Sequence, residues 1–212
     1  MPTFSLVINA GGQSRRMGQD KALLPVPKSG QPLLRHIVDR LRALPIDRVI
    51  IVANKPAWVQ YLPSDIPALY VPDAYPGAGP LGGLATGVQA CLDWGIYLAC
   101  DLPLVNPHVL QFLCELAGEP LKAGGARWDA IVPRIGGYEQ PLHALYQRSV
   151  APAITKCLAA GERRATSFLP HVRVRWVSEA ELHPLDPDLA SFFNVNTPAE
   201  WAEAVRLLDL GL

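Results

Sequence analysis

Short apolar runs alternate with helix-like segments, and this order restricts the fold more than any other feature of the sequence. Residues 4–8 (FSLVI) form the first strand-like run, and residues 48–52, 69–71 and 96–99 form the next three. Between the first two, residues 32–43 carry apolar side chains at helical spacing, after a proline suited to a first helical turn. Strands that alternate with helices predict an α/β fold, with a mainly parallel sheet and helices on both faces.

The remaining segments extend this pattern over the whole chain. Further helices are expected at residues 84–94, 105–116, 148–160 and 198–208, and further strands at residues 129–133, 140–146 and 172–177. We see no internal repeat and no low-complexity linker in the sequence. We therefore expect a single domain over residues 1–212, with residues 1–105 and 106–212 as its two halves.

The composition disfavours several classes of protein. The chain has 212 residues with 19 basic and 19 acidic side chains, so its bulk charge does not indicate a nucleic-acid partner. Its apolar runs are well short of the roughly 20 residues that span a membrane, and the N-terminal residues lack the basic segment of a signal peptide. The four cysteines show no CxxC spacing, which argues against a zinc site or disulfide framework and favours the cytoplasm.

The first strand-like run ends in a loop rich in glycine and positive charge, INAGGQSRRMGQDK at residues 8–21. Ligands of open parallel sheets bind outside the carboxyl ends of the strands. Gly11 and Gly12 allow the backbone to approach a ligand closely, while Arg16 and Lys21 carry charges that suit phosphate oxygens. The loop lacks both GxxxxGK[ST] and GxGxxG, which disfavours a P-loop and a dinucleotide oxidoreductase. The alternative is a solvated basic turn that only links a strand to a helix.

Two aspartates follow strand-like runs and are expected at the same edge of the sheet as this loop. Asp101 directly follows the run at residues 96–99 in IYLACDLP, and Asp73 follows ALYVP. A carboxylate in this place suits Mg²⁺, which binds hard oxygens together with substrate phosphates. The alternative for Asp101 is a helix cap, and the alternative for Asp73 is an ordinary turn before Pro76 and Gly77.

Taken together, these motifs resemble the molybdenum cofactor guanylyltransferases. The family motif near LAGGxSxRMGxDKxLL is similar to INAGGQSRRMGQDKALL, with Asn9 where the family usually has leucine. The segments VPDAYPGAGPLGGL, ACDLP, QPLHALY, LAAGERRATSFL and FFNVNTPAEW follow in the family's order and cover nearly the whole chain. The first motif indicates only the wider class of nucleotidyltransferases, whereas GERR and NVNTP indicate the molybdopterin branch.

The resemblance implies a Rossmann-like nucleotidyltransferase fold and transfer of GMP from GTP to molybdopterin, with Mg²⁺ as cofactor and release of pyrophosphate. Residues 1–105 would then bind the nucleotide and residues 106–212 the molybdopterin. By position in the motifs, it implies nucleotide binding by Asn9, Ala10, Gly11, Gly12, Lys21, Asn54, Asp73 and Asp101. It implies catalysis by Arg16, Lys21 and Asp101, with Mg²⁺ bound by Asp101. It implies molybdopterin binding by Arg163, Arg164, Asn194 and Asn196.

Other interpretations of these residues stay open at this point. The two arginines of GERR also suit a solvated charge cluster, and Asn196 also suits the start of a helix before Pro198. His143, in the apolar run PLHALY, is interpreted as an interior or pocket-wall residue and not as a base.

The function also has alternatives. A CTP-dependent molybdopterin cytidylyltransferase and a sugar-1-phosphate nucleotidyltransferase share the glycine-basic loop and the acid after a strand. A nucleotide-binding adaptor without catalysis is the alternative outside the enzymes. We expect transient contact with cofactor-biosynthesis proteins or molybdoenzymes, and no nucleic-acid or membrane partner.

Overall fold

The computed structural model describes residues 2–11, 20–54, 56–119 and 127–210. In chain order, its strands are β1 (Phe4–Asn9), β2 (Ile46–Val52), β3 (Ala68–Val71), β4 (Trp94–Ala99), β5 (Ala130–Ile135), β6 (Tyr138–Glu139), β7 (His143–Gln147) and β8 (Val174–Val177). Its α-helices are α1 (Leu33–Arg40), α2 (Gly79–Ala90), α3 (Pro107–Gly118), α4 (Ala151–Ala159), α5 (Glu179–Leu182) and α6 (Pro198–Asp209). Short 3-10 helices are η1 (Lys21–Leu23), η2 (Pro56–Tyr61), η3 (Arg148–Val150), η4 (Leu169–His171) and η5 (Ala190–Phe192).

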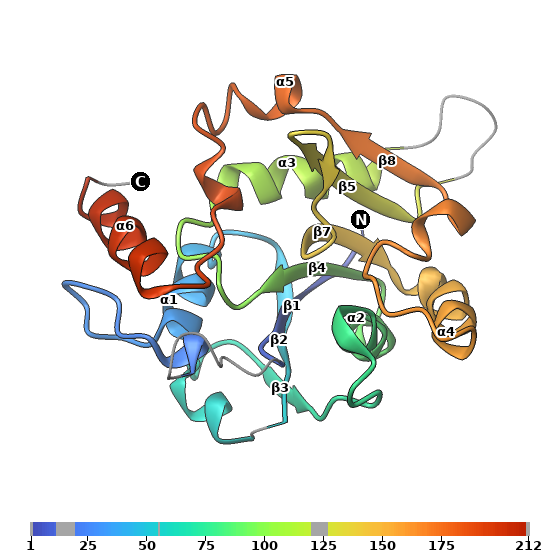
Figure 1. Cartoon of the computed structure of the whole chain (residues 1–212), viewed down its shortest axis with the longest axis horizontal. Helices are drawn as coiled ribbons and strands as arrows, with labels where there is room; N and C mark the ends of the chain where they lie inside the picture. Colours follow the sequence, from blue (N-terminus) through green and yellow to red (C-terminus); the bar gives the residue numbers. More distant parts are fainter. Residues whose placement is uncertain (1, 12–19, 55, 120–126, 211–212) are drawn as a thin grey trace.

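All eight strands join one sheet in the order β3-β2-β1-β4-β7-β5-β6, with β8 paired to β5 (Figure 1). Strands β3, β2, β1 and β4 run parallel, β7 runs antiparallel to β4 and to β5, and β8 runs parallel to β5. The carboxyl ends of β1 to β4 therefore lie along one edge of the sheet. The predicted α/β fold with a mainly parallel sheet is confirmed.

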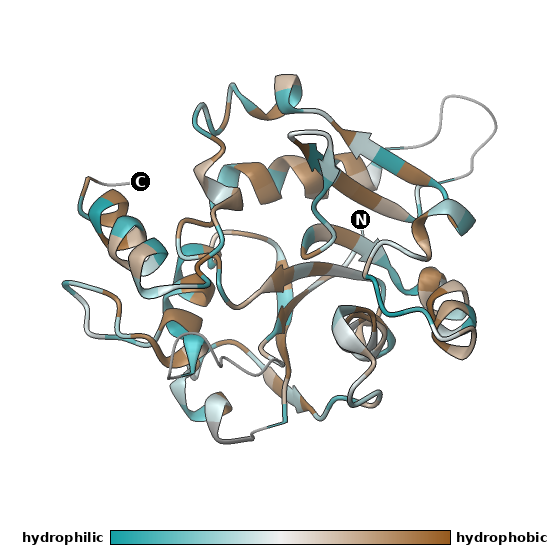
Figure 2. Ribbon diagram, in the orientation of Figure 1, coloured by the Kyte–Doolittle hydropathy of each residue, from teal (hydrophilic) through white to brown (hydrophobic). Residues whose placement is uncertain are grey.

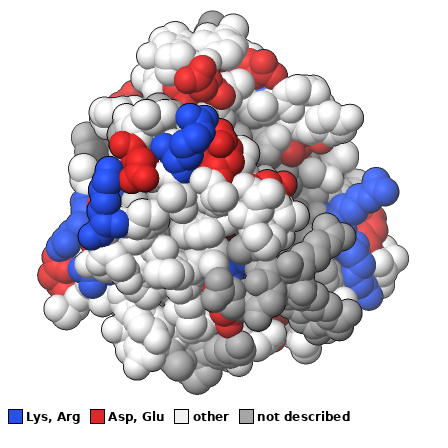
Figure 3. All heavy atoms as spheres, turned by 60° about the vertical axis from the view of Figure 1, so that its left-hand side comes forward, with Lys and Arg blue, Asp and Glu red and all other residues white. Residues whose placement is uncertain are grey.

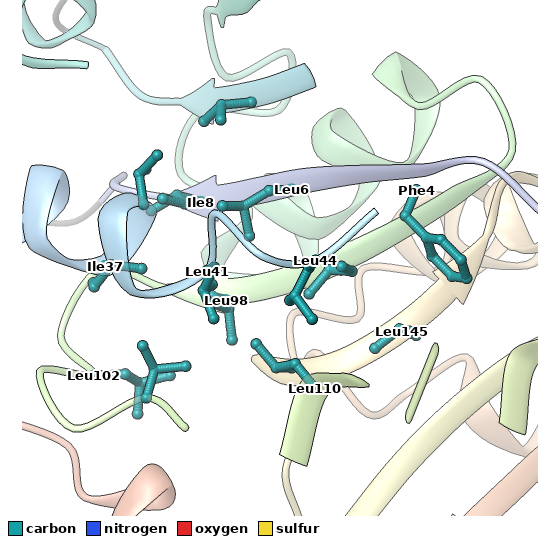
Figure 4. Packing of buried hydrophobic residues seen from close by; sticks show 14 of the residues in the cluster. Phe4, Leu6, Ile8, Ile37, Leu41, Leu44, Leu98, Leu102, Leu110 and Leu145 are labelled. Atoms are coloured by element: carbon teal, nitrogen blue, oxygen red, sulfur yellow. The ribbon is translucent and has the colours of Figure 1, made fainter. Parts of the chain in front are cut away.

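Helices cover both faces of the sheet and create two apolar cores. One core joins the sheet to α1 and α3, and the other joins it to α2 and α4. Every residue from Phe4 to Ile8 is buried, because alternate side chains of β1 enter opposite cores. Figure 4 shows Leu6 and Ile8 of β1 in the first core, with Ile37 of α1 and Leu41, the residue after α1, near them. Figure 2 shows the same pattern as apolar colour along the central strands.

Helix α2 differs from the prediction that placed a helix at residues 84–94. It begins at Gly79 and ends at Ala90, and Trp94 is already the first residue of β4. Its glycines suggested a turn because glycine is a weak helix former. In the structure they permit close packing instead: a Cβ built on Gly83 would lie 2.6 Å from Nδ2 of Asn9. The helix thus lies directly against the end of β1.

The strand expected at residues 140–146 is also different. The chain forms the two-residue strand β6, turns at Pro141, and then enters β7, which extends to Gln147. The hydroxyl of Tyr146 donates to the carbonyl of Pro141 over 2.8 Å and closes this turn. The hairpin turn between β5 and β6 uses Gly136 and Gly137, both with positive φ, as their sequence predicts.

Within residues 2–11, 20–54, 56–119 and 127–210, no helix is both long and apolar enough to cross a membrane.

The close packing of α2 gives a test of the fold. A Cβ on Gly87 would lie 2.6 Å both from Cε2 of Tyr97 and from Cγ1 of Val7. We expect Gly87→Ala to lower the free energy of unfolding by about 1–3 kcal/mol, because overpacking outweighs the better helix propensity of alanine. Gly118→Ala is the matched control, since a Cβ there meets nothing within 4 Å. Chemical denaturation of both variants checks this, and equal stabilities would contradict it.

Candidate active site at the carboxyl edge of the sheet

The glycine loop leaves the sheet between two neighbouring parallel strands. Asn9 is the last residue of β1, and its carbonyl accepts from the amide of Cys100 after β4 over 3.2 Å. The amide of Ala10 donates to the carbonyl of Val52 at the end of β2 over 2.9 Å. These bonds hold the start of the loop at the edge where the sequence predicted a ligand site.

Three of the predicted site residues meet at this edge. The ammonium of Lys21 donates to Oδ2 of Asp101 over 3.0 Å and to Oδ1 of Asn196 over 2.7 Å. The Lys21 and Asp101 side chains are only 15% and 19% exposed, so water screens their attraction less than on an open surface. The three residues come from η1, from the loop after β4 and from the residues before α6. The cluster therefore joins the two halves of the chain.

The backbone around Asp101 keeps this arrangement in place. The carbonyl of Asp101 accepts from the amide of Val195 over 2.9 Å, and the Val195 side chain is fully buried. Because side chains alternate along an extended segment, Asn194 and Asn196 both point away from the buried side of Val195. Asn196 reaches Lys21, whereas Asn194 is exposed.

Asp101 has a free coordination position of the kind that a cation needs. Its Oδ2 contacts Lys21, while its Oδ1 is buried and has no hydrogen-bond partner among the described residues. A buried carboxylate oxygen without a partner is costly, and a cation would satisfy it. The described part of the chain holds no group of three His, Cys, Asp or Glu side chains suited to a metal. Asp101 therefore fits Mg²⁺ held mainly by substrate oxygens and water.

The side chain of Asn9 has a local structural role. Its Oδ1 accepts from the amide of Gly11 over 3.1 Å, and its Nδ2 lies against Gly83 of α2. The polar residue at this position thus folds back onto its own loop. Gly12 and Arg16, both predicted from the same loop, lie outside the described residues.

Asp73 acts as a turn residue at the end of β3. Its Oδ1 accepts from the amide of Tyr75 over 2.9 Å and lies 3.3 Å from the hydroxyl of Thr86 in α2. This is the turn interpretation of Asp73, and its nucleotide contact stays a prediction. Asn54, two residues beyond β2, is exposed at the same edge of the sheet.

The GERR segment lies against the N-terminus of α2. The carbonyl of Arg163 accepts from the amide of Leu81 over 3.3 Å, and a Cβ on Gly79 would lie 3.2 Å from that carbonyl. The residues Arg163 and Arg164 are both exposed. The structure therefore places these arginines beside the helix that follows the Asp73 turn, and among the described residues neither arginine contacts Asn196.

Glu200 belongs to the site, although the sequence analysis did not select it. Its Oε2 accepts from the amides of Asn196 and Thr197 over 2.7 and 2.8 Å. The first of these bonds is the main reason why the pKa of Glu200 is lowered, so the carboxylate is charged. The pattern Thr197-x-x-Glu200 is a capping box, which was the signal available in the sequence.

His143 is an interior residue, as the sequence analysis interpreted it. Its side chain is 2% exposed and stacks on Phe192, with ring centroids 4.3 Å apart. Its Nε2 lies 3.4 Å from the hydroxyl of Ser191. Burial lowers the pKa of His143 to about 3, so the ring is neutral near pH 7.

Charged side chains of both signs are mixed on the face turned forward in Figure 3, where Lys and Arg side chains lie next to Asp and Glu side chains. Arg206 and Glu203 on α6 form another pair of opposite charge, with 2.6 Å between their charged atoms. This interspersed pattern is consistent with the balanced charge of the chain.

The fold and the site together define a class of enzyme. A glycine loop after the first strand, with a lysine and an aspartate paired at the carboxyl edge of a mainly parallel sheet, is the arrangement of a nucleotidyltransferase. Residues 6–175 match the family described as MobA-like NTP transferase domain. The chain belongs to this family.

Named relatives extend over nearly the whole chain. A molybdenum cofactor guanylyltransferase from Syntrophotalea carbinolica is 36% identical, over 91% of this chain and 86% of the relative. The protein of the same name from Vibrio cholerae is 32% identical, over 94% of this chain and 90% of the relative. The crystal structure of molybdopterin-guanine dinucleotide biosynthesis protein A from Archaeoglobus fulgidus has a TM-score of 0.77 at 25% identity, covering 97% of this chain and 99% of that one.

The buried histidine predicts a dependence of stability on pH. The folded-state pKa of His143, about 3, is below the unfolded value of about 6.5. The unfolded chain therefore binds an extra proton between these values. The stability from neutral His143 is complete above about pH 6.5 and is lost as the pH falls, by up to about 1.4 kcal/mol per pH unit.

We expect His143→Gln to lose less stability than the unchanged protein between pH 7 and pH 4. Denaturant midpoints across this range measure the difference. His171→Gln is the control, because His171 is exposed. Parallel pH profiles for the His143 variant and the unchanged protein would contradict the expectation.

Proposed function

We propose that this chain transfers GMP from GTP to the terminal phosphate of molybdopterin-bound molybdenum cofactor. The observation that carries the proposal is the cluster of Lys21, Asp101 and Asn196, which joins the nucleotide half to the second half at the carboxyl edge. The names of the relatives support guanosine as the nucleoside and the molybdenum cofactor as the acceptor.

The reaction brings two anions together, so charge is its main obstacle. A phosphate oxygen of molybdopterin forms a bond to the α-phosphorus of GTP, and the bond from that phosphorus to the β-phosphate oxygen breaks. The acceptor phosphate is already ionised near pH 7, so no general base is required. The chain must instead align the two phosphates and stabilise the charge that develops on pyrophosphate.

Lys21, Asp101 and the glycine loop would each contribute to this reaction. Lys21 would bring its ammonium to the triphosphate and would neutralise the pyrophosphate as it departs. Asp101 would hold Mg²⁺ through its unpartnered Oδ1. When bound, Mg²⁺ would neutralise phosphate charge and orient the leaving group. Asn9, Ala10, Gly11 and Gly12 would contact the nucleotide through the loop backbone.

The arginines of GERR fit a place for phosphate near the second substrate. The N-terminus of a helix favours anions, and Arg163 lies directly beside the first turn of α2. We propose that Arg163 and Arg164, with Asn194 and Asn196, bind molybdopterin. Nucleotide contacts of Asn54 and Asp73, catalysis by Arg16, a cytoplasmic location and transient contacts with cofactor-biosynthesis proteins stay predictions.

The choice of nucleotide can be tested directly. We expect GTP with Mg²⁺ to bind at least ~10-fold more tightly than CTP, a difference of about 1.4 kcal/mol. Titration calorimetry with GTP, CTP and ATP measures this. Equal affinities for GTP and CTP would overturn the guanylyl assignment and favour the cytidylyl alternative, without affecting the fold.

The roles of Lys21 and Asp101 can be tested by kinetics. Lys21→Ala and Asp101→Asn should each lower kcat on the order of 100-fold and weaken GTP binding much less, because the charge that they meet grows in the transition state. Pyrophosphate release and GTP affinity are measured for each folded variant. Lys28→Ala is a matched control, because Lys28 is 73% exposed and pairs with Asp209. Near-normal turnover in both site variants would show that the loop is a structural turn.

A further inference from the structure

Glu200 accepts a hydrogen bond from the backbone of Asn196, while the side chain of Asn196 accepts one from Lys21. We propose that Glu200 is a positioning residue, which holds Asn196 so that Asn196 can hold the ammonium of Lys21. The inference rests on the proposed function, because it assigns Glu200 to the same site.

Glu200 accepts one hydrogen bond more than the glutamate of an ordinary capping box does. In such a box, the N-cap side chain accepts from the N3 amide and the N3 side chain accepts from the N-cap amide. Thr197 and Glu200 make both bonds, the first over 3.2 Å and the second over 2.8 Å. The same Oε2 atom also accepts from the amide of Asn196 over 2.7 Å, one residue before the cap. The carboxylate thus fixes the backbone on which the Asn196 side chain stands.

The side chain of Asn196 in turn holds the ammonium of Lys21. The Oδ1 atom of Asn196 accepts from the Lys21 ammonium over 2.7 Å, and Oδ2 of Asp101 accepts from it over 3.0 Å. The four-carbon stem of lysine is flexible, so the acceptors around the ammonium decide where its charge lies. On the other side of Asn196, the amide of Val195 is bonded to the carbonyl of Asp101. Glu200 therefore completes a set of hydrogen bonds that begins in α6 and ends at the ammonium of Lys21.

The hydrogen bonds from Glu200 through Asn196 to Lys21 should affect kcat more than they affect the binding of GTP. A cation that neutralises a leaving group must stay where that charge develops, and small displacements of such a group cost large factors in rate. Loss of the Glu200 carboxylate would leave the amide of Asn196 without its acceptor and let the Oδ1 atom shift. We expect kcat to fall while the KM for GTP stays nearly constant.

The experiment compares three substitutions in α6. Glu200→Ala should lower kcat roughly tenfold, with the KM for GTP within about twofold. Glu200→Gln should recover most of the loss, because an amide oxygen can accept the same two N–H bonds and glutamine also serves in capping boxes. Glu203→Ala should leave kcat unchanged, since Glu203 is on the same helix but pairs with the exposed Arg206.

A fourth variant separates positioning from the stability of the helix. Thr197→Ala removes the cap of the Glu200 amide but keeps both bonds that the carboxylate accepts. It should lower the melting temperature and leave kcat within about twofold. If Thr197→Ala lowers kcat as much as Glu200→Ala does, the effect comes from the helix and the inference is wrong. Equal losses in the Ala and Gln variants of Glu200 would also overturn it.

A double-mutant cycle tests the route through Lys21. Glu200→Ala should have little further effect on kcat in a Lys21→Ala background, because residues that act through one contact are not additive. Independent, multiplicative losses would overturn the inference and leave the proposed function intact. If the unchanged protein transfers no GMP from GTP to molybdopterin, the proposed function itself fails, whereas normal GMP transfer by Lys21→Ala overturns only the roles of Lys21 and Glu200, so the two failures are distinguishable.

Discussion

The ion pair between Lys21 and Asp101 is the contact on which the rest of the site depends. Both side chains are largely removed from water, so each charge requires a partner. Removal of either residue would leave the other charge poorly compensated at the edge of the sheet. Asn196 supplies an additional acceptor for the lysine, and three segments far apart in the sequence are thereby held together. The Oδ1 of Asp101, which has no hydrogen-bond partner in the described part of the chain, then remains for a ligand of opposite charge.

The close approach of α2 to the sheet supports this edge from the other face. Gly82, Gly83 and Gly87 have no side chain, and a Cβ on any of them would lie less than 3 Å from a neighbouring atom. The helix can therefore lie against Tyr75, Asn9 and Tyr97. Its first turn lies beside Arg163, and Gly83 lies against Asn9 at the end of β1. The same glycines that weaken the helix as an isolated segment are required for its place in the fold.

Much of the fold could be predicted from local patterns. The apolar runs at β1, β2 and β4 indicated parallel strands because both faces of such strands are largely buried. The start of α2 was predicted wrongly because propensity gives no information about a tightly packed neighbour. The break between β6 and β7 was also missed, since the turn there is held by the bond from the amide of His143 to the carbonyl of Gln140 and by the bond from the hydroxyl of Tyr146 to the carbonyl of Pro141. In both cases a contact in space outweighed the local preference of the residues.

The candidate site, like the fold, could be predicted only in part from the sequence. Lys21, Asp101 and Asn196 could be selected from the sequence, because each stands in a motif and carries chemistry suited to phosphate or metal. Their contact could not be derived, because residues 80 and 175 positions apart meet only when the whole sheet and α6 are in place. Asn9 appeared in the sequence only as a departure from the family motif, and the structure shows its amide bonded to the loop and packed on Gly83.

The sequence by itself determined the parallel α/β architecture, the family and the residue types of the site, because periodicity and motifs are local properties of the chain. Only the tertiary structure decided which of those residues touch, which aspartate oxygen stays without a partner, and that Glu200 supports Asn196. These are properties of distances between segments, and such distances follow from the packing of helices on both faces of the sheet.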